Sequence, residues 1–125
     1  MIKVYIPRDK DFNYKQCKKL FKKNRKLLCD NRDFKEIVYT TFFYSFFDDE
    51  KHLGCIYYYY DNDKLFVNVV AYRHTHLINL ECFKLSLTWF SCDIYANCLH
   101  RTSKIGALKC GFKRVNNNLF KYERS

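Results

Sequence analysis

Cysteines and histidines are the side chains of this sequence with the widest range of chemistry, from metal binding to nucleophilic catalysis. Zinc sites commonly take two thiolates from one tight turn, as in a C-x-x-C pair, and no two cysteines have this spacing. The nearest approaches are Cys98-x-His100 and His74-x-His76. The seven cysteines are Cys17, Cys29, Cys55, Cys82, Cys92, Cys98 and Cys110. This odd, scattered set predicts reduced thiols that act as small apolar side chains, and no metal site.

Carboxylates are the other side chains that commonly perform acid–base catalysis. Asp93 and Glu81 each stand alone in their segments and are expected to be surface charges. The residue types alone therefore predict no catalytic side chain.

The stretch Ile105–Arg114 carries the clearest local structural signal. Gly111 is the expected left-handed stop of a helix over His100–Cys110. Phe112 would then begin a strand that packs back on that helix.

Apolar periodicity divides the rest of the chain into elements. The expected strands are Ile2–Ile6, Ile37–Phe47, Leu53–Tyr60, Leu65–Tyr72, Ile94–Ala96 and Phe112–Tyr122, the last broken at Asn116–Asn118. The expected helices are Phe12–Cys29, His76–Phe90 and His100–Cys110. Within His76–Phe90, the alternation of Phe83, Leu85, Leu87 and Trp89 also fits a strand. Asn31–Glu36 is expected to be a polar connector or one more helical turn. Polar turns at Asp48–Lys51 and Asp61–Asp63 join three strands into an antiparallel meander. This order predicts an α+β architecture.

The order of elements and the ending helix–Gly111–Phe112–strand resemble the GNAT superfamily, the acyl-CoA-dependent N-acyltransferases. The resemblance covers nearly the whole chain as architecture, and as a motif only the last strand–helix–strand unit. It implies one GNAT-like domain over residues 1–125, with a mostly antiparallel mixed sheet flanked by helices. It also implies an acyl-CoA site where two parallel strands splay apart.

In that superfamily a loop of the pattern Gln/Arg-x-x-Gly-x-Gly/Ala holds the pyrophosphate through backbone amides at a helix start. Arg73 takes the first position, whereas His76 and Ile78 take the glycine positions. Their side chains would fill the space of the pyrophosphate, although protonated His74 and His76 could touch a phosphate. Asn97 stands near the place of a motif asparagine. The degenerate cofactor-binding set is thus Arg73, His74, His76 and Asn97.

The superfamily's acid is a tyrosine in the pattern Asn-x-x-Ala-x-x-x-Tyr, and it protonates the departing CoA thiolate. Counted back from Gly111-Phe112, the tyrosine position falls on Ala107, which has no proton to give. Tyr95 or Tyr122 could serve instead, but nothing in the sequence places either. The resemblance therefore predicts no catalytic residue and leans against an enzyme.

A closer resemblance concerns Asn97-x-x-His100 followed by Ile105-Gly106-Ala107. This arrangement resembles the end of small internal virion proteins of short-tailed bacteriophages, which also look like GNAT domains without the glycine loop or the tyrosine. It implies a structural component whose partners are other virion proteins, located in the virion or the host-cell cytoplasm.

The charge balance favours anionic partners. The 23 Lys and Arg against 13 Asp and Glu give a net charge of +10, which suits nucleic acid, acidic proteins or CoA phosphates. Lys15, Lys19, Lys22 and Lys26 are expected to form one helix face that meets such a partner. An ordinary solvated helix face is the alternative.

Three functions stay open at this level. The first is a non-catalytic GNAT-fold protein without a cofactor, and the second is an N-acetyltransferase that uses acetyl-CoA with an atypical phosphate loop. The third is a basic nucleic-acid-binding module in which Tyr57–Tyr60 stack on bases, although alternate tyrosines of a strand face opposite sides. The apolar stretches are too short to span a bilayer, and no signal peptide follows Met1.

Overall fold

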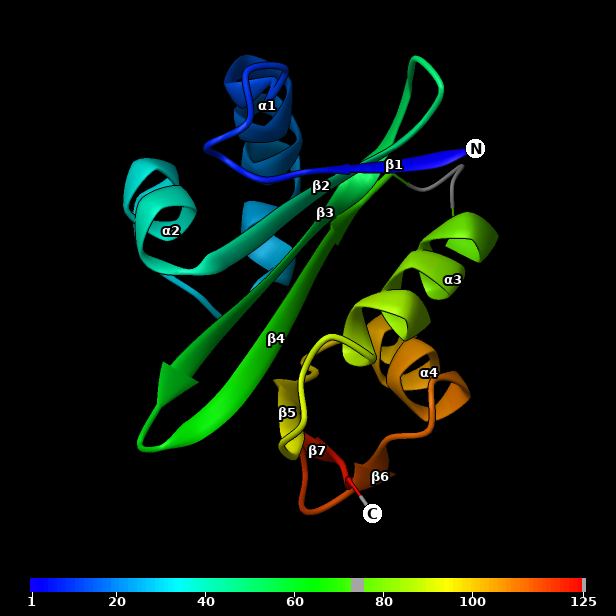
Figure 1. Ribbon diagram of the computed structural model, residues 1–125. Coiled ribbons are helices and arrows are strands. Elements are labelled where there is room, and N and C mark those ends of the chain that lie inside the picture. The colour runs from blue at the N-terminus through cyan, green and yellow to red at the C-terminus, as the bar shows by residue number, and fades with distance from the viewer. Residues whose placement is uncertain (73–75, 125) are drawn as a thin grey trace.

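The structure is a computed structural model that describes residues 1–72 and 76–124, and of residues 76–78 only the backbone. A twisted sheet runs through the middle of the molecule, with two helices on each face (Figure 1). Helices α1 (Tyr14–Asn24) and α2 (Phe34–Thr40) cover one face. Helices α3 (His76–Leu87) and α4 (Arg101–Lys109) cover the other.

The sheet has seven strands in the order β1-β2-β3-β4-β5-β7-β6. Their bounds are β1 Ile2–Tyr5, β2 Phe42–Asp48, β3 Lys51–Asp61, β4 Lys64–Ala71, β5 Ile94–Asn97, β6 Lys113–Arg114 and β7 Leu119–Tyr122, and a 3-10 turn, η1, covers Arg25–Leu27. All neighbours are antiparallel except β4 and β5, which are parallel. The expected meander of three consecutive strands is confirmed as β2, β3 and β4.

The turns of the meander form because their residues tolerate a left-handed backbone. Asn62 and Asp63, between β3 and β4, have φ of 51° and 64°, and Asp49, between β2 and β3, has φ of 52°. Asn and Asp accept these angles more readily than other side chains. Two consecutive left-handed residues also match the twist of a tight hairpin. The polar turns expected from the sequence are therefore the turns observed.

The sheet separates two apolar cores. The first lies against α3 and α4 and includes Phe46, Tyr58 and Phe120. The second lies against α1 and α2 and includes Leu20, Phe43 and Tyr57. The central strands β2, β3 and β4 supply side chains to both cores, because successive side chains of a strand point to opposite faces of the sheet.

The prediction of a strand over Ile37–Phe47 is wrong in its first part. Residues Phe34–Thr40 form α2, and β2 begins only at Phe42. Phe34, Ile37 and Val38 follow helical spacing and are at most 5% exposed. These three side chains pack between α2 and the sheet. That packing outweighs the strand propensity of β-branched residues, because such a propensity is a weak preference.

Other element ends differ by a few residues. The first helix is α1 and then η1, so the helical region stops at Leu27 instead of Cys29, and α3 ends at Leu87 instead of Phe90. The expected strand over Phe112–Tyr122 is two short strands, β6 and β7. None of the described helices is both long enough and apolar enough to cross a membrane.

Candidate functional site

The parallel strands β4 and β5 separate soon after they meet. They pair only at Leu65 with Ile94 and at Phe66 with Tyr95. Beyond these pairs β4 continues to Ala71, and β5 continues to Asn97 with β7 on its other side. The chain leaves β4 toward α3 and leaves β5 toward α4 (Figure 1). This is the splayed pair in which the resemblance places an acyl-CoA site.

The candidate cofactor residues are only partly placed. Arg73 and His74 lie outside the described residues, and His76 is described only as the first backbone position of α3. Asn97 is the last residue of β5, half-buried, and pairs with Leu119 of β7. Asn97 therefore lies at the end of β5, two residues beyond the last pair that β5 forms with β4.

The residue at which the resemblance places the tyrosine acid has a buried methyl group. Ala107 lies on α4, is 3% exposed and belongs to the core under α3 and α4. Its carbonyl accepts a hydrogen bond from the backbone of Phe112 where the helix ends. His100 begins the helix, and its backbone N–H donates to the hydroxyl of Ser103. The helix is thus built and capped without a side chain that can release a proton at position 107.

The substitute acids are held in other contacts. The ring of Tyr95 packs on Phe66 and lies between the ammonium groups of Lys64 and Lys121, at 5.2 and 5.6 Å. The ring of Tyr122 meets the edge of Phe112.

Asp93 is not a free base. Its carboxylate accepts a 2.8 Å hydrogen bond from the backbone of Arg124 and lies 3.5 Å from the ammonium of Lys121. The hydrogen bond from Arg124 lowers the pKa of this carboxyl. Asp93 therefore ties the C-terminal segment to β5.

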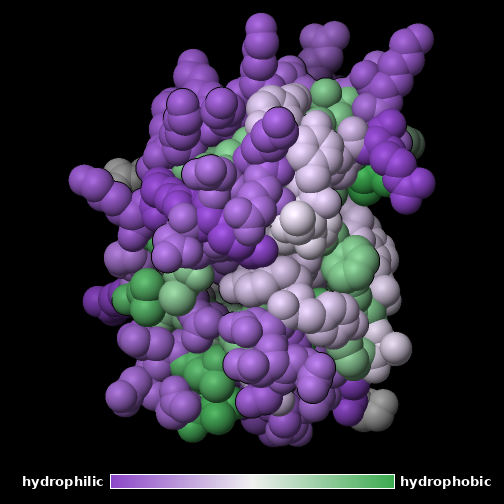
Figure 2. All heavy atoms as spheres, turned by 90° about the vertical axis from the view of Figure 1, so that its left-hand side faces the viewer, coloured by the Kyte–Doolittle hydropathy of each residue, from purple (hydrophilic) through white to green (hydrophobic). Residues whose placement is uncertain are grey.

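The predicted lysine face consists of Lys15, Lys19 and Lys22 on α1 and Lys26 in η1. Lys15, Lys19, Lys22 and Lys26 are all exposed, and among the described residues none of them is ion-paired. On the face that Figure 2 shows, which is the left-hand side of Figure 1, hydrophilic side chains gather over the upper part, where α1 lies. A pocket of about 480 Å³ beside α1 is lined by Asn13, Lys15, Gln16, Lys19, Leu20, Lys23 and Tyr72.

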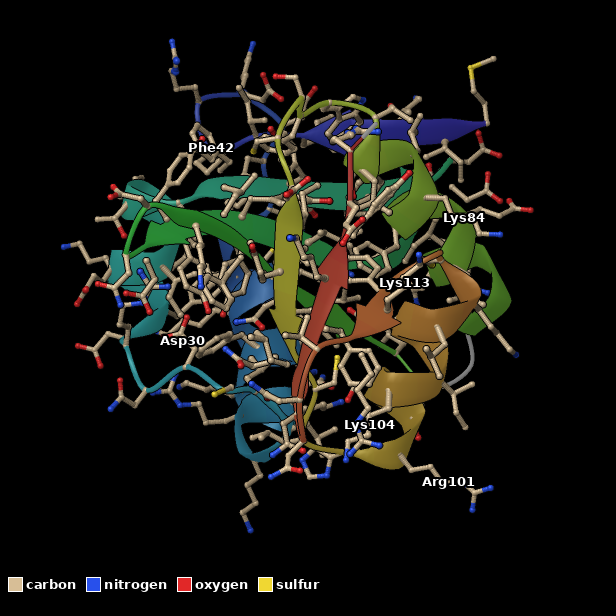
Figure 3. All side chains as sticks on the ribbon, turned by 90° about the horizontal axis from the view of Figure 1, so that it is seen from below. Asp30, Phe42, Lys84, Arg101, Lys104 and Lys113 are labelled. Atoms are coloured by element: carbon tan, nitrogen blue, oxygen red, sulfur yellow. The ribbon has the colours of Figure 1, made fainter. Side chains whose placement is uncertain are left out.

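A second basic group lies on the opposite layer. Lys84 of α3, Arg101 and Lys104 of α4, and Lys113 of β6 lie on the side formed by these elements (Figure 3). Lys84, Arg101 and Lys113 are exposed, whereas Lys104 is half-buried. Positive charge is thus not confined to α1.

The tyrosine run Tyr57–Tyr60 does not form a stacking platform. Tyr57 and Tyr58 are 0% exposed and point into the two separate cores. Only Tyr60 is well exposed, at 61%. The run serves mainly to fill the interior, which removes the stacking argument for nucleic-acid binding.

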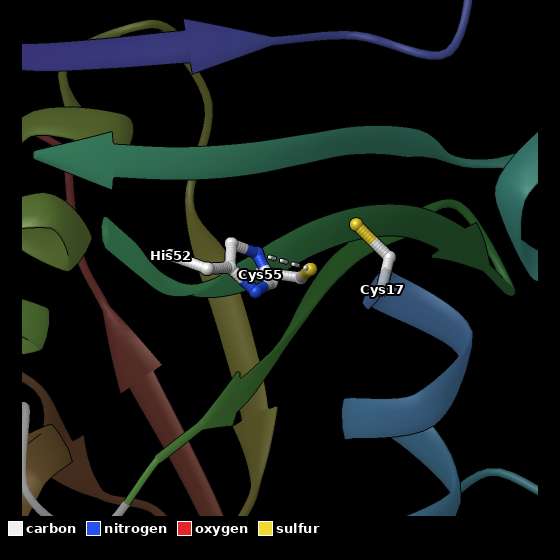
Figure 4. A group of neighbouring side chains, drawn as sticks. All are labelled: Cys17, His52 and Cys55. Atoms are coloured by element: carbon white, nitrogen blue, oxygen red, sulfur yellow. Dashed lines mark hydrogen bonds between the residues drawn. The ribbon is translucent and has the colours of Figure 1, made fainter. Parts of the chain in front are cut away.

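A compact group of polar side chains lies under α1, on the face of the sheet opposite to α3 and α4. It consists of Cys17 on α1, Ser45 on β2, and His52 and Cys55 on β3 (Figure 4). The hydroxyl of Ser45 lies 3.3 Å from Sγ of Cys17 and 3.0 Å from Nε2 of His52. Sγ of Cys55 lies 3.7 Å from the same Nε2. All four side chains are at most 5% exposed.

An irregularity in β3 brings two of these residues to one face. His52 and Cys55 are three positions apart, a spacing that places side chains on opposite faces of a regular strand. The register of β2 against β3 shifts between Phe46 and Phe47, which pair with Gly54 and His52 and leave Leu53 as an extra residue. This bulge turns His52 toward α1, where Cys55 already points.

The two thiols differ in acidity. A hydrogen bond from Cys55, together with His52 and Ser45, lowers the pKa of the Cys17 thiol despite its burial. Burial and the neighbouring Cys17 raise the pKa of the Cys55 thiol well above its ordinary value. One proton therefore leaves this pair much more easily than the second.

This group was not predicted from the sequence, because Cys17 is 35 residues away from His52 and no two of its cysteines form a close pair. Cys17 and Cys55 are joined only by the packing of α1 on β3, and the bulge that orients His52 has no clear sequence signal. All seven cysteine thiols are free, and five of them are buried.

Comparison with known proteins gives a fold but no sequence family. No protein-family model matches the chain, and no curated protein matches its sequence. The structure is similar to the crystal structure of an N-acetyltransferase from Staphylococcus aureus Mu50, with a TM-score of 0.74 and 11% sequence identity. The match covers 98% of this chain and 97% of that one. At such low identity the likeness concerns the fold alone, so the chain has a GNAT-like α+β fold.

Proposed function

We propose that this chain is a non-catalytic protein with a GNAT-like fold that acts as an interaction component of a larger assembly, such as a bacteriophage particle. The observation that carries the proposal is Ala107. A buried methyl group, 3% exposed, occupies the place where the resemblance puts the tyrosine acid. A fold does not bring its function with it when the site residues are changed.

The lysine face supports a role in binding. Four exposed lysines without acidic partners among the described residues give α1 and η1 a positively charged surface. Such a surface attracts an acidic protein surface or packaged nucleic acid and speeds docking. On this proposal the protein lies in the particle or in the host-cell cytoplasm with its partners.

Exposed aromatic side chains add possible anchors. Tyr39, Phe42 and Tyr60 are 65%, 47% and 61% exposed, and the rings of Phe42 and Tyr60 contact each other at 6.4 Å. Phe42 lies at the edge of the molecule, away from the basic group on α3 and α4 (Figure 3). Aromatic residues are enriched among side chains that dominate interface binding energy.

Calorimetry of the reduced protein with acetyl-CoA tests the proposal. We expect no saturable binding, because the phosphate loop lacks its glycines and the acid position lacks a hydroxyl. A micromolar dissociation constant, about −8 kcal/mol of binding free energy, would contradict it. A second experiment uses mass spectrometry on large assemblies purified from the cells that produce the chain. We expect the chain in the particle fraction and not free in the lysate.

An acyl-CoA-dependent N-acetyltransferase is the second candidate. The separation of β4 and β5 after two residue pairs favours it, as does the N-acetyltransferase with a similar fold. On this candidate, Arg73, His74, His76 and Asn97 contact acetyl-CoA. Transfer of the acetyl group to an amine panel, detected by mass spectrometry and weakened by Asn97→Ala, would replace the first proposal with this one.

A further inference from the structure

The group under α1 has the donor atoms and the spacing of a tetrahedral metal site. Zinc bonds of about 2.3 Å to sulfur and about 2.0 Å to nitrogen place neighbouring ligand atoms about 3.5 to 3.8 Å apart. Cys55 Sγ and His52 Nε2 are 3.7 Å apart, and the ligand atoms of Cys17, His52 and Cys55 all lie within 4.8 Å of one another. The three residues come from two separate elements, α1 and β3, and meet at one point (Figure 4).

We propose that this group binds one Zn²⁺ through the thiolates of Cys17 and Cys55 and Nε2 of His52, with the Ser45 hydroxyl at the fourth position. Ser45 Oγ lies 3.3 Å from Cys17 Sγ and 3.0 Å from His52 Nε2. Its oxygen is therefore close enough to two of the three ligand atoms to complete the coordination of one ion. Two thiolates and an imidazole are ligands that zinc prefers.

The imidazole of His52 is already oriented for this role. Its Nδ1 lies 2.8 Å from the hydroxyl of Tyr72. When Nδ1–H donates to that oxygen, Nε2 carries the lone pair on the side where Ser45 Oγ and Cys55 Sγ lie. Metal-binding histidines commonly donate their second N–H to such a partner, which fixes ring and tautomer. The edge of Tyr72 also contacts the His52 ring, at 5.4 Å between centroids.

Burial makes the site structural. Cys17 and Cys55 are 1% exposed, His52 is 5% exposed and Ser45 is 0% exposed, whereas a catalytic zinc keeps a position open to substrate. Binding requires both thiols in their thiolate form, and Zn²⁺ with two thiolates carries no net charge. The ion would join α1 to β3 in the core that α1 and α2 cover, so its binding free energy would stabilise the folded state.

Metal analysis of the untagged protein, purified with a phosphine reductant and without chelator, tests the proposal. We expect one zinc per chain after growth with added zinc. Removal of the metal by chelation should lower the melting temperature, and added Zn²⁺ should restore it. Cobalt added to the metal-free protein should give the intense visible absorption of a tetrahedral site and a thiolate charge-transfer band.

Cysteine variants identify the ligands. Cys17→Ala and Cys55→Ala should each lower retained zinc at least tenfold. Cys82→Ala and Cys98→Ala, which remove buried thiols from the other core (2% and 4% exposed), should retain zinc as the wild type does. Circular dichroism checks the fold of each variant, and the cobalt spectrum of the wild type needs no variant.

Three results would overturn the proposal. They are a wild-type protein that takes up neither zinc nor cobalt, a Cys17→Ala variant that keeps its zinc, and a protein that binds copper(I) but not zinc. None of them bears on acetyl-CoA binding, so this inference stands or falls separately from the proposed function.

Discussion

The hydroxyl of Tyr57 donates a 2.9 Å hydrogen bond to Oδ2 of Asp30 and so links the centre of β3 to the segment before α2. The same carboxylate accepts hydrogen bonds from Nε and Nη2 of Arg32, at 2.9 and 2.7 Å. Asn68 donates to the Tyr57 oxygen at 3.0 Å. Because the Asp30 side chain is 4% exposed, its charge depends on these partners.

Asp30→Asn should destabilise the protein by about 1–3 kcal/mol, the usual cost of leaving buried hydrogen-bonding groups unsatisfied. The amide keeps the shape of the carboxylate but cannot accept bonds at both of its atoms from Arg32 and Tyr57. Urea unfolding followed by circular dichroism measures the loss. Asp11→Asn, at an exposed position, is the matched control and should change stability little. Equal stabilities for the two variants would contradict the role of Asp30.

The contribution of Asp30 should also depend on pH. Burial works against its ionisation, but the hydrogen bonds from Arg32 and Tyr57 outweigh burial and lower the pKa below the ordinary value of 3.8. The folded state thus holds the proton less tightly than the unfolded state. The stabilisation is complete above the unfolded pKa and is lost as pH falls through the folded pKa. The stability gap between wild type and Asp30→Asn should therefore close on acidification below pH 3.8.

Gly54→Ala should destabilise the sheet. Gly54 has a φ of +154°, and a Cβ there would lie 2.8 Å from the carbonyl oxygen of Val70 and 3.0 Å from Oδ1 of Asn79. Forcing an atom into a packed site costs about 1–3 kcal/mol. Gly106→Ala is the control, because its nearest neighbour would be 3.8 Å away and alanine favours helix by about 1 kcal/mol. Thermal melts should shift in opposite directions, and a shift in the same direction would refute this account.

Placing a tyrosine at position 107 should not give the protein acetyltransferase activity. Ala107 is packed in the core, so Ala107→Tyr should cost about 1–3 kcal/mol through overpacking. Thermal unfolding measures that cost, and mass spectrometry measures acetyl transfer to amines. Ala107→Ser tests the site with less strain. A folded variant that gains transfer activity would mean that the rest of an acyltransferase site is intact.

Charge reversal on α1 should separate binding from folding. The double variant Lys19→Glu and Lys22→Glu should fold normally, because exposed positions usually change stability by under about 0.5 kcal/mol. It should weaken incorporation into the assembly, most clearly at low salt, where charge attraction is least screened. The double variant Arg101→Glu and Lys113→Glu makes the same change of net charge on the other layer and should incorporate normally. Normal incorporation of both variants would make the α1 lysines an ordinary solvated face.

The meander could be predicted because its signals are local. β3 and β4 are short runs of apolar and aromatic residues bounded by polar turns, and Asn62 and Asp63 favour the hairpin between them on their own. The residues Ile37 and Val38 misled the prediction for the same reason. Their strand propensity is local, whereas the helix that they form is set by packing against the sheet.

The two candidate sites differ in how much of each could be predicted from the sequence. That Ala107 takes the place which the resemblance gives to the tyrosine acid could be predicted from Gly111-Phe112, since the spacing along one helix is fixed. The group of Cys17, His52 and Cys55 could not, since it needs the path of α1 over the sheet and the extra residue Leu53. Arg73 and His74 remain predictions.

The two-residue strand β6 also bears on self-association. An unpaired sheet edge can recruit the same edge of a second molecule. Here that edge offers only Lys113 and Arg114, both exposed. Antiparallel pairing of two such edges would place like charges opposite each other, which is unfavourable. Two copies of the protein should therefore not associate by pairing their β6 edges.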